Sequence, residues 1–265
     1  MKKNNLLYVL FGLAIFGYGI FTYQSISNQI INYNAYNSKE TKITINKPNN
    51  INEDGSFVLS NSTITKDFEK KDGVRTYNWY ADPYCPDCIR IHEATHEYIE
   101  QSLKDGSIQI MFHPLNFTSH KSGEYSLTVS AWVSGLADVS QDSEKVYKFM
   151  TKIWNNATKE DLKNLTDVSL EEKIVNIANE IGFSKKEVKQ VSDNLKGYEF
   201  AINQASVNIR RMDKFKELSP KKDKSFFVPF IYGENGKALD GESEKIDSDI
   251  LGPLKGLVPC SESCH

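Results

Sequence analysis

The sequence predicts an α/β fold in which a sheet is interrupted by a helical block, preceded by one N-terminal transmembrane helix. Runs of β-branched and aromatic residues before and after a long stretch of helical periodicity indicate the sheet and the block. A pair of cysteines, Cys85 and Cys88, stands between one of these strands and a helix. An uncharged apolar run near the N-terminus indicates the transmembrane helix.

The apolar run extends over residues 6–23 and contains no charge. At ~1.5 Å per residue it reaches about 27 Å, near the lower limit for crossing a bilayer. Two lysines precede it and no charge follows before Lys39, which by the positive-inside rule leaves the remainder of the chain outside the cytoplasm. We therefore expect a retained anchor over residues 1–23, with a cleaved signal peptide as the alternative.

After the anchor, residues 24–54 are polar and rich in asparagine, which is typical of a linker. Residues 55–258 then form one domain, with the helical insertion at about 120–218, and residues 259–265 form a tail that contains two cysteines. The predicted strands are Ser56–Leu59, Val74–Tyr80, Ser107–Phe112 and Phe226–Tyr232, with a last one after a Gly-rich turn within Gly233–Leu239. The predicted helices are Ile89–Leu103, Tyr125–Leu136, Glu144–Asn155, Leu170–Ile181, Lys185–Leu195 and Phe200–Phe215.

The charge balance argues against a nucleic-acid-binding protein. The 265 residues include 32 Lys and Arg against 35 Asp and Glu, a net charge of −3, so no overall positive field attracts a polyanion. With 39% hydrophobic and 25% charged residues, the composition is that of a folded domain rather than of a disordered chain.

The sequence Cys85-Pro86-Asp87-Cys88 carries the predicted chemistry. Two thiols at this spacing on the first turn of a helix can close and reopen a small disulfide ring. At the helix start, unpaired N–H groups and the helix dipole favour the Cys85 thiolate, and Pro86 fits the first helical position. Cys85 is thus the expected attacking thiol and Cys88 the resolving thiol. A half zinc site and an inert structural disulfide are the alternatives.

The run from Trp79 to Cys88 resembles the active-site strand and helix start of DsbA-like thiol-disulfide oxidoreductases, which have a thioredoxin fold with a helical insertion. The similarity extends over residues 57–254. It implies that Pro229 is a cis proline lying against the cysteine pair, and that Val228 offers backbone groups to an extended substrate segment. We expect no cofactor and no metal.

One residue departs from the best-known oxidising members of that family, because Asp87 stands where they have His. A carboxylate near Cys85 disfavours its thiolate, so we expect Asp87 to make the pair a weaker oxidant. Pro86 and Asp87 are the residues expected to tune the redox potential.

Two further patterns leave alternatives open. The sequence His92-Glu93-Ala94-Thr95-His96 matches the HExxH zinc motif, which would make the protein a zinc-dependent hydrolase; otherwise both histidines lie on a partly exposed helix face. Cys260 and Cys264 in the tail are expected to form a second disulfide, or to act as a mobile dithiol that exchanges electrons with the first pair.

Together these features predict a bacterial, single-pass cell-membrane enzyme with its catalytic domain on the extracytoplasmic side. It would form or exchange disulfides in exported client proteins that carry free or mispaired cysteines, and an unidentified partner would recycle it. A disulfide reductase or isomerase of the same fold, the zinc hydrolase, and a redox-inert chaperone are the alternatives.

Overall fold

The architecture is taken from a computed structural model of the chain, and all of the residues it describes lie within one unit, Ile45–His265. It describes residues 48–69, 71–117, 123–157, 167–209, 212–219, 221, 223–233 and 238–239. The predicted anchor and the tail with Cys260 and Cys264 lie outside this set. None of the helices in the described part of the chain has the length and apolar character that a membrane span requires.

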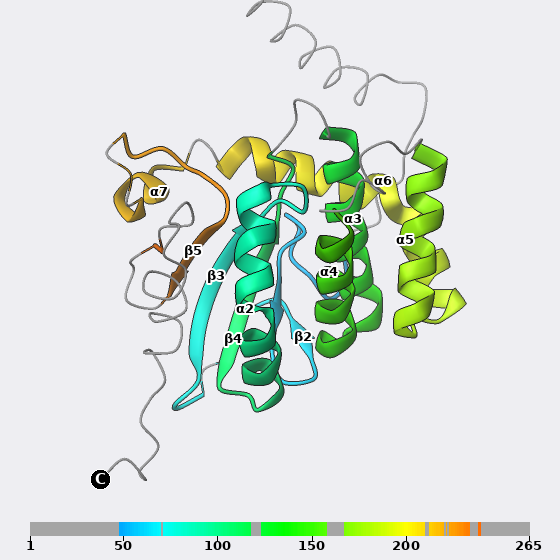
Figure 1. Cartoon of the computed structure of the whole chain (residues 1–265), viewed down its shortest axis with the longest axis horizontal. Coiled ribbons are helices and arrows are strands. Elements are labelled where there is room, and N and C mark those ends of the chain that lie inside the picture. The colour runs from blue at the N-terminus through cyan, green and yellow to red at the C-terminus, as the bar shows by residue number, and fades with distance from the viewer. Residues whose placement is uncertain are drawn as a thin grey trace, which may run out of the picture. The chain divides into compact units, whose positions relative to one another are not determined.

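A five-stranded mixed sheet forms the centre of this unit (Figure 1). Its strands are β1 (Phe57–Leu59), β2 (Ile64–Thr65), β3 (Arg75–Ala81), β4 (Ile108–Pro114) and β5 (Phe230–Gly233). They lie in the order β2-β1-β4-β3-β5, and only β3 and β4 run parallel. A parallel pair needs a crossover connection, and helix α2 (Pro86–Lys104) supplies it between these two strands.

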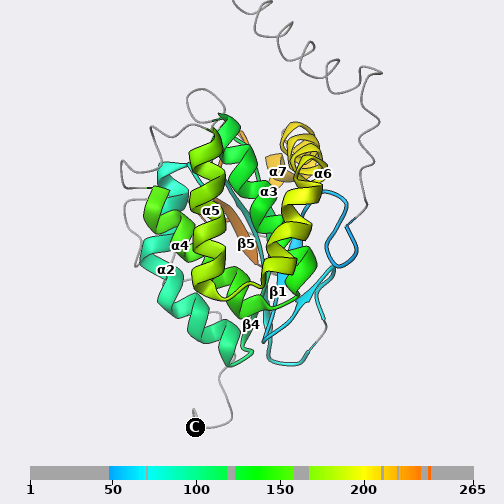
Figure 2. The same ribbon diagram turned by 90° about the vertical axis from the view of Figure 1, so that its right-hand side faces the viewer.

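The helical insertion follows β4 and precedes β5, as predicted. It contains α3 (Gly123–Ser140), α4 (Ser143–Ala157), α5 (Asp167–Ile181), α6 (Lys185–Ile209) and α7 (Asp213–Leu218). Figure 2 looks onto α3, α4, α5 and α6 with the sheet behind them, and Figure 1 shows α7 beside β5. The sequence and the structure therefore agree on a sheet that a block of helices interrupts.

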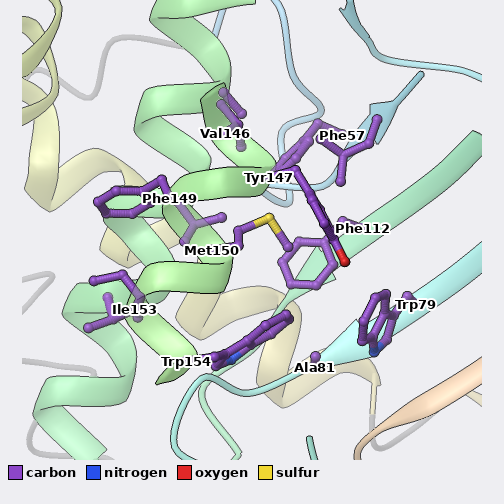
Figure 3. Close-up of a cluster of buried hydrophobic side chains, with 14 of the residues drawn as sticks. Phe57, Trp79, Ala81, Phe112, Val146, Tyr147, Phe149, Met150, Ile153 and Trp154 are labelled. Carbon is purple, nitrogen blue, oxygen red and sulfur yellow. The ribbon is translucent and has the colours of Figure 1, made fainter. Parts of the chain in front are cut away.

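Aromatic side chains hold the helical insertion against the sheet (Figure 3). The ring centroids of Trp154 on α4 and Trp79 on β3 lie 5.6 Å apart, and those of Trp154 and Phe112 on β4 lie 6.0 Å apart. Figure 3 also shows Met150 pointing toward Phe112. All four side chains are buried, and each contributes about 2–3 kcal/mol of hydrophobic free energy on burial.

The element predictions were wrong in two places, and one short strand was missed. The expected helices Lys185–Leu195 and Phe200–Phe215 are one helix as far as Ile209, because buried side chains at helical spacing, Val191, Tyr198 and Ile202, continue past Gly197. The last long strand begins only at Phe230, since Pro229 before it has no N–H to donate to a ladder. Strand β2 is two residues long and has no sequence pattern that predicts it.

Candidate active site

The cysteine pair lies where β3 ends and α2 begins. Cys85 is the N-cap of α2, with extended backbone angles of −74° and 122°, and Pro86 opens the helix. The N–H of Cys85 donates to the carbonyl of Asp82 at 3.1 Å, and the carbonyl of Cys85 accepts from the N–H of Ile89 at 3.0 Å. The predicted position of Cys85 at the helix start is therefore confirmed.

The two thiols have different environments. Cys85 retains 7% of its surface and Cys88 none, and both are free thiols in this structure. The hydrogen bond from the Cys88 thiol lowers the pKa of Cys85, and the N–H groups of Cys88 and Asp87 act in the same direction, whereas burial and the charge of Asp82 oppose them. Burial raises the pKa of Cys88 well above its ordinary value, and the bond with Cys85 adds to this. This asymmetry suits one attacking and one resolving thiol.

The segment before β5 lies against the cysteine pair. The peptide bond between Val228 and Pro229 is cis, as the resemblance implied. The Cys85 Sγ lies 3.4 Å from the carbonyl oxygen of Val228, in a geometry that lets the thiol donate. Residues more than a hundred positions apart in the sequence are thus brought together at one site.

Asp87 contacts the site through its backbone. Its carboxylate lies at the surface, 3.2 Å from the guanidinium of Arg90, while its backbone N–H lowers the pKa of Cys85. The carboxylate that raises the pKa of both thiols belongs to Asp82.

The sequence analysis missed Asp82, a fully buried residue in the loop after β3. Its Oδ1 accepts a hydrogen bond from the N–H of Tyr84 at 2.8 Å, and its Oδ2 accepts one from the N–H of Phe117 at 2.6 Å. The signal that could have pointed to it is a carboxylate placed directly after a buried strand and three residues before the first cysteine.

The HExxH motif does not form a solvent-facing metal site. His92 is fully buried, with its ring 4.2 Å from that of Trp154 and 6.4 Å from that of Trp79, so the expectation of a partly exposed face is wrong for His92. His96 is half-buried and Glu93 is exposed. No group of three or more His, Cys, Asp or Glu side chains within the described ranges is arranged to hold a metal ion.

The architecture and the site together define a thioredoxin fold with a helical insertion. More particularly, the fold is DsbA-like, and the solved structures that share it include bacterial thiol-disulfide oxidoreductases. The MdbA thiol-disulfide oxidoreductase of Actinomyces oris matches with a TM-score of 0.57 at 13% identity, over 85% of this chain and 97% of that one. The MdbA thiol-disulfide oxidoreductase of Corynebacterium diphtheriae matches with a TM-score of 0.53 at 17% identity, over 71% of this chain and 85% of that one.

A third solved structure, DsbA of Mycobacterium tuberculosis in its reduced form, matches with a TM-score of 0.52 at 15% identity, over 77% of this chain and 94% of that one. The sequence itself matches no protein-family model and no curated protein. The likeness therefore concerns the fold.

Proposed function

We propose that this protein is an extracytoplasmic thiol-disulfide oxidoreductase that forms or exchanges disulfides in exported proteins through Cys85 and Cys88. The observation that carries the proposal is the pairing of an acidic, slightly exposed thiol at a helix start with a fully buried thiol one turn along. The similarity of the fold to solved structures of thiol-disulfide oxidoreductases supports the same function.

The oxidising reaction consists of two thiol-disulfide exchanges. A client thiolate attacks the Cys85 sulfur of the oxidised pair, which breaks the Cys85–Cys88 bond, forms a mixed disulfide and releases Cys88, which takes up a proton. A second client thiolate then attacks the client sulfur of the mixed disulfide and expels Cys85 as a thiolate. The client gains a disulfide and the pair gains two electrons, which a separate recycling partner must remove. The lowered pKa of Cys85 makes it the better leaving group.

Val228 and the aromatic residues around the site supply a surface for an extended client segment. The Val228 carbonyl lies at Cys85 and is the backbone acceptor we assign to the client. Half-buried aromatic rings lie close to Cys85 and Val228 in the sequence: Tyr84 packs against Tyr125 at the start of α3 with centroids 6.5 Å apart, and Phe226 packs against Phe117 with centroids 5.6 Å apart.

A trapping experiment tests the function. The purified protein is oxidised and mixed with a reduced, unfolded client that contains two cysteines, and formation of the client disulfide is followed. We expect Cys88→Ser, once its Cys85 is activated as a mixed disulfide, to accumulate a stable covalent adduct with a single-cysteine variant of the client, because neither Cys88 nor a second client thiol is present to break the bond. Cys85→Ser is expected to form no adduct and to oxidise no client. Equal activity of Cys85→Ser and wild type would contradict the proposal.

The location is a separate part of the proposal, resting on the uncharged run of residues 6–23 and the lysines before it. A single span there would tether the domain outside the cytoplasm. In intact cells whose envelope admits protease, the folded domain is expected to be cleaved from the membrane fraction while a cytoplasmic marker is spared. Protection of the domain equal to that of the marker would contradict this location.

Reduction and isomerisation use the same groups in the opposite direction, with the Cys85 thiolate attacking a client disulfide and Cys88 resolving it. Whether the protein oxidises or reduces its clients depends on the reduction potential of the Cys85–Cys88 pair.

A further inference from the structure

Asp82 contacts both halves of the cysteine pair through its own backbone. Its carbonyl accepts from the N–H of Cys85 at 3.1 Å, and its N–H forms a hydrogen bond with the sulfur of Cys88. The side chain of Asp82 is fully buried in the loop between β3 and Cys85, where little water screens a charge. Any charge on that side chain therefore acts on each of the two cysteines.

The side chain of Asp82 joins the two loops that frame the site. The bond from Tyr84 N–H holds the loop that leads into α2, and the bond from Phe117 N–H holds the loop that follows β4. The carbonyl of Ala81, the preceding residue, also accepts from the N–H of Leu115 at 2.9 Å. Both oxygens of this buried carboxylate therefore have a backbone hydrogen-bond partner.

A negative charge at this place opposes the features that make Cys85 acidic. The N–H groups at the helix start and the Cys88 thiol stabilise the Cys85 thiolate, and the charge of Asp82 raises the pKa of both thiols against them. The other titratable group beside Cys85 is Tyr84, whose pKa burial raises well above its ordinary value, so that it stays neutral. Asp87 has its carboxylate on Arg90 at the surface.

We propose that Asp82 is a positioning residue that clamps the two loops around the pair and places a buried negative charge against both sulfurs, which moderates the oxidising power of the enzyme. A thiolate that is less stable in the reduced form makes the dithiol less favoured and the disulfide more favoured. The inference rests on the proposed redox function and identifies which side chain tunes it. It assigns to Asp82 the tuning that the sequence analysis assigned to Asp87.

The test is the equilibrium of the full-length protein with glutathione, in which the dithiol and oxidised glutathione give the disulfide and two reduced glutathione molecules. We expect Asp82→Asn, which removes the charge, to shift this equilibrium at least about fivefold toward the dithiol and to lower the pKa of Cys85 measured by thiolate absorbance. Asp87→Asn is the matched control, because it removes a carboxylate of the same cysteine motif; we expect it to stay within about twofold of wild type.

Asp82→Glu separates charge from clamping, because it keeps the charge and changes the loop geometry. We expect its Cys85 pKa to remain nearer to wild type than to Asp82→Asn. An equilibrium of Asp82→Asn within about twofold of wild type, or an equal fall of the Cys85 pKa in both variants, would overturn the proposal.

If Asp82→Asn does not fold, the wild-type protein still tests the coupling. The carboxyl carbon resonance of Asp82 must shift as Cys85 titrates, and a resonance that stays constant through that titration would overturn the inference. Failure of the wild-type pair to form a disulfide with oxidised glutathione at all would instead contradict the proposed function.

Discussion

The sulfur of Cys85 lies 3.4 Å from the carbonyl oxygen of Val228, although the two residues are 143 positions apart in the chain. The helix start that carries Cys85 and the backbone that we assign to the client therefore come from distant parts of the chain. The helical insertion lies between them in sequence and folds back so that β5 pairs with β3. The site thus depends on the whole sheet.

The first prediction concerns which thiol is accessible. Native, reduced protein treated with excess iodoacetamide at pH 7 is expected to be alkylated at Cys85 and not at Cys88, because only Cys85 has exposed surface and the pKa of Cys88 is raised. Mass spectrometry of tryptic peptides measures this, and protein unfolded in denaturant serves as the control in which both react. Alkylation of Cys88 before Cys85 would contradict the assigned roles.

The second prediction concerns the buried imidazole of His92. Both of its ring nitrogens are buried without a hydrogen-bond partner, which costs about 1–3 kcal/mol. We expect His92→Leu to raise the free energy of unfolding at pH 7.5 by a similar amount, measured by urea denaturation. His96→Leu, one turn along on the half-buried part of the same helix, is the control and is expected to change it less.

The same residue predicts an acid dependence. Burial lowers the pKa of His92 from 6.5 to about 3, so the unfolded chain binds the proton more tightly than the folded protein between these values. The free energy of unfolding is therefore expected to fall as the pH drops from 6.5 toward 3, and to fall less steeply in His92→Leu. Burial also lowers the pKa of His113 to about 3. The His92→Leu variant is therefore expected to keep part of the decrease in unfolding free energy with falling pH. Identical slopes for the two proteins would contradict this.

The third prediction concerns the close approach of α3 and α6. A Cβ added at Gly135 would lie 2.5 Å from Cγ1 of Val191 and 3.0 Å from Cε2 of Tyr198. We expect Gly135→Ala to lower the free energy of unfolding by about 1–3 kcal/mol. Adding Val191→Ala should restore part of the loss, so that the double variant is more stable than the sum of the single effects predicts. Additive losses would mean that the two residues do not meet.

The fourth prediction concerns the attachment of the chain before β1. Asp138 on α3 accepts from the backbone N–H groups of Asn49 and Asn50 at 2.8 and 2.7 Å, and from the Tyr198 hydroxyl at 2.8 Å. We expect Asp138→Ala to lower the free energy of unfolding by about 2–3 kcal/mol, and Asp138→Asn by less, because the amide keeps one acceptor. An Ala variant as stable as wild type would show that these bonds contribute nothing.

Local features of the sequence predicted the elements and the cysteine pair. The order of strand, cysteines and helix follows from short-range periodicity and from the chemistry of a helix start, which Cys85 and Pro86 display directly. The single helix α6 was predicted as two helices, and the buried side chains on both sides of Gly197, such as Val191 and Tyr198, belong to one continuous packed face. The side of α2 on which His92 is buried likewise depends on Trp79 and Trp154, from elements that no local pattern connects.

The approach of Val228 to Cys85 was expected from a resemblance and not from any local pattern. Asp82 was overlooked for a related reason. A carboxylate in a loop is normally solvated, and only the tertiary contact with Phe117 N–H shows that this one is buried. Asp87 was expected to tune the redox potential because it lies between the two cysteines in the sequence. In the structure its side chain turns outward to Arg90.

The central claim is that the hydrogen bond from Cys88, together with the N–H groups of the helix start, makes the Cys85 thiol a better thiolate than an ordinary cysteine. The most direct test is the pH dependence of the iodoacetamide reaction rate of Cys85 in the Cys88→Ala variant and in the reduced wild type, with each rate normalised to that of free cysteine. We predict a midpoint below the ordinary value of about 8.5 in the wild type, and a higher midpoint in the variant, which lacks the hydrogen bond from Cys88. A wild-type midpoint at or above that of free cysteine would contradict the account.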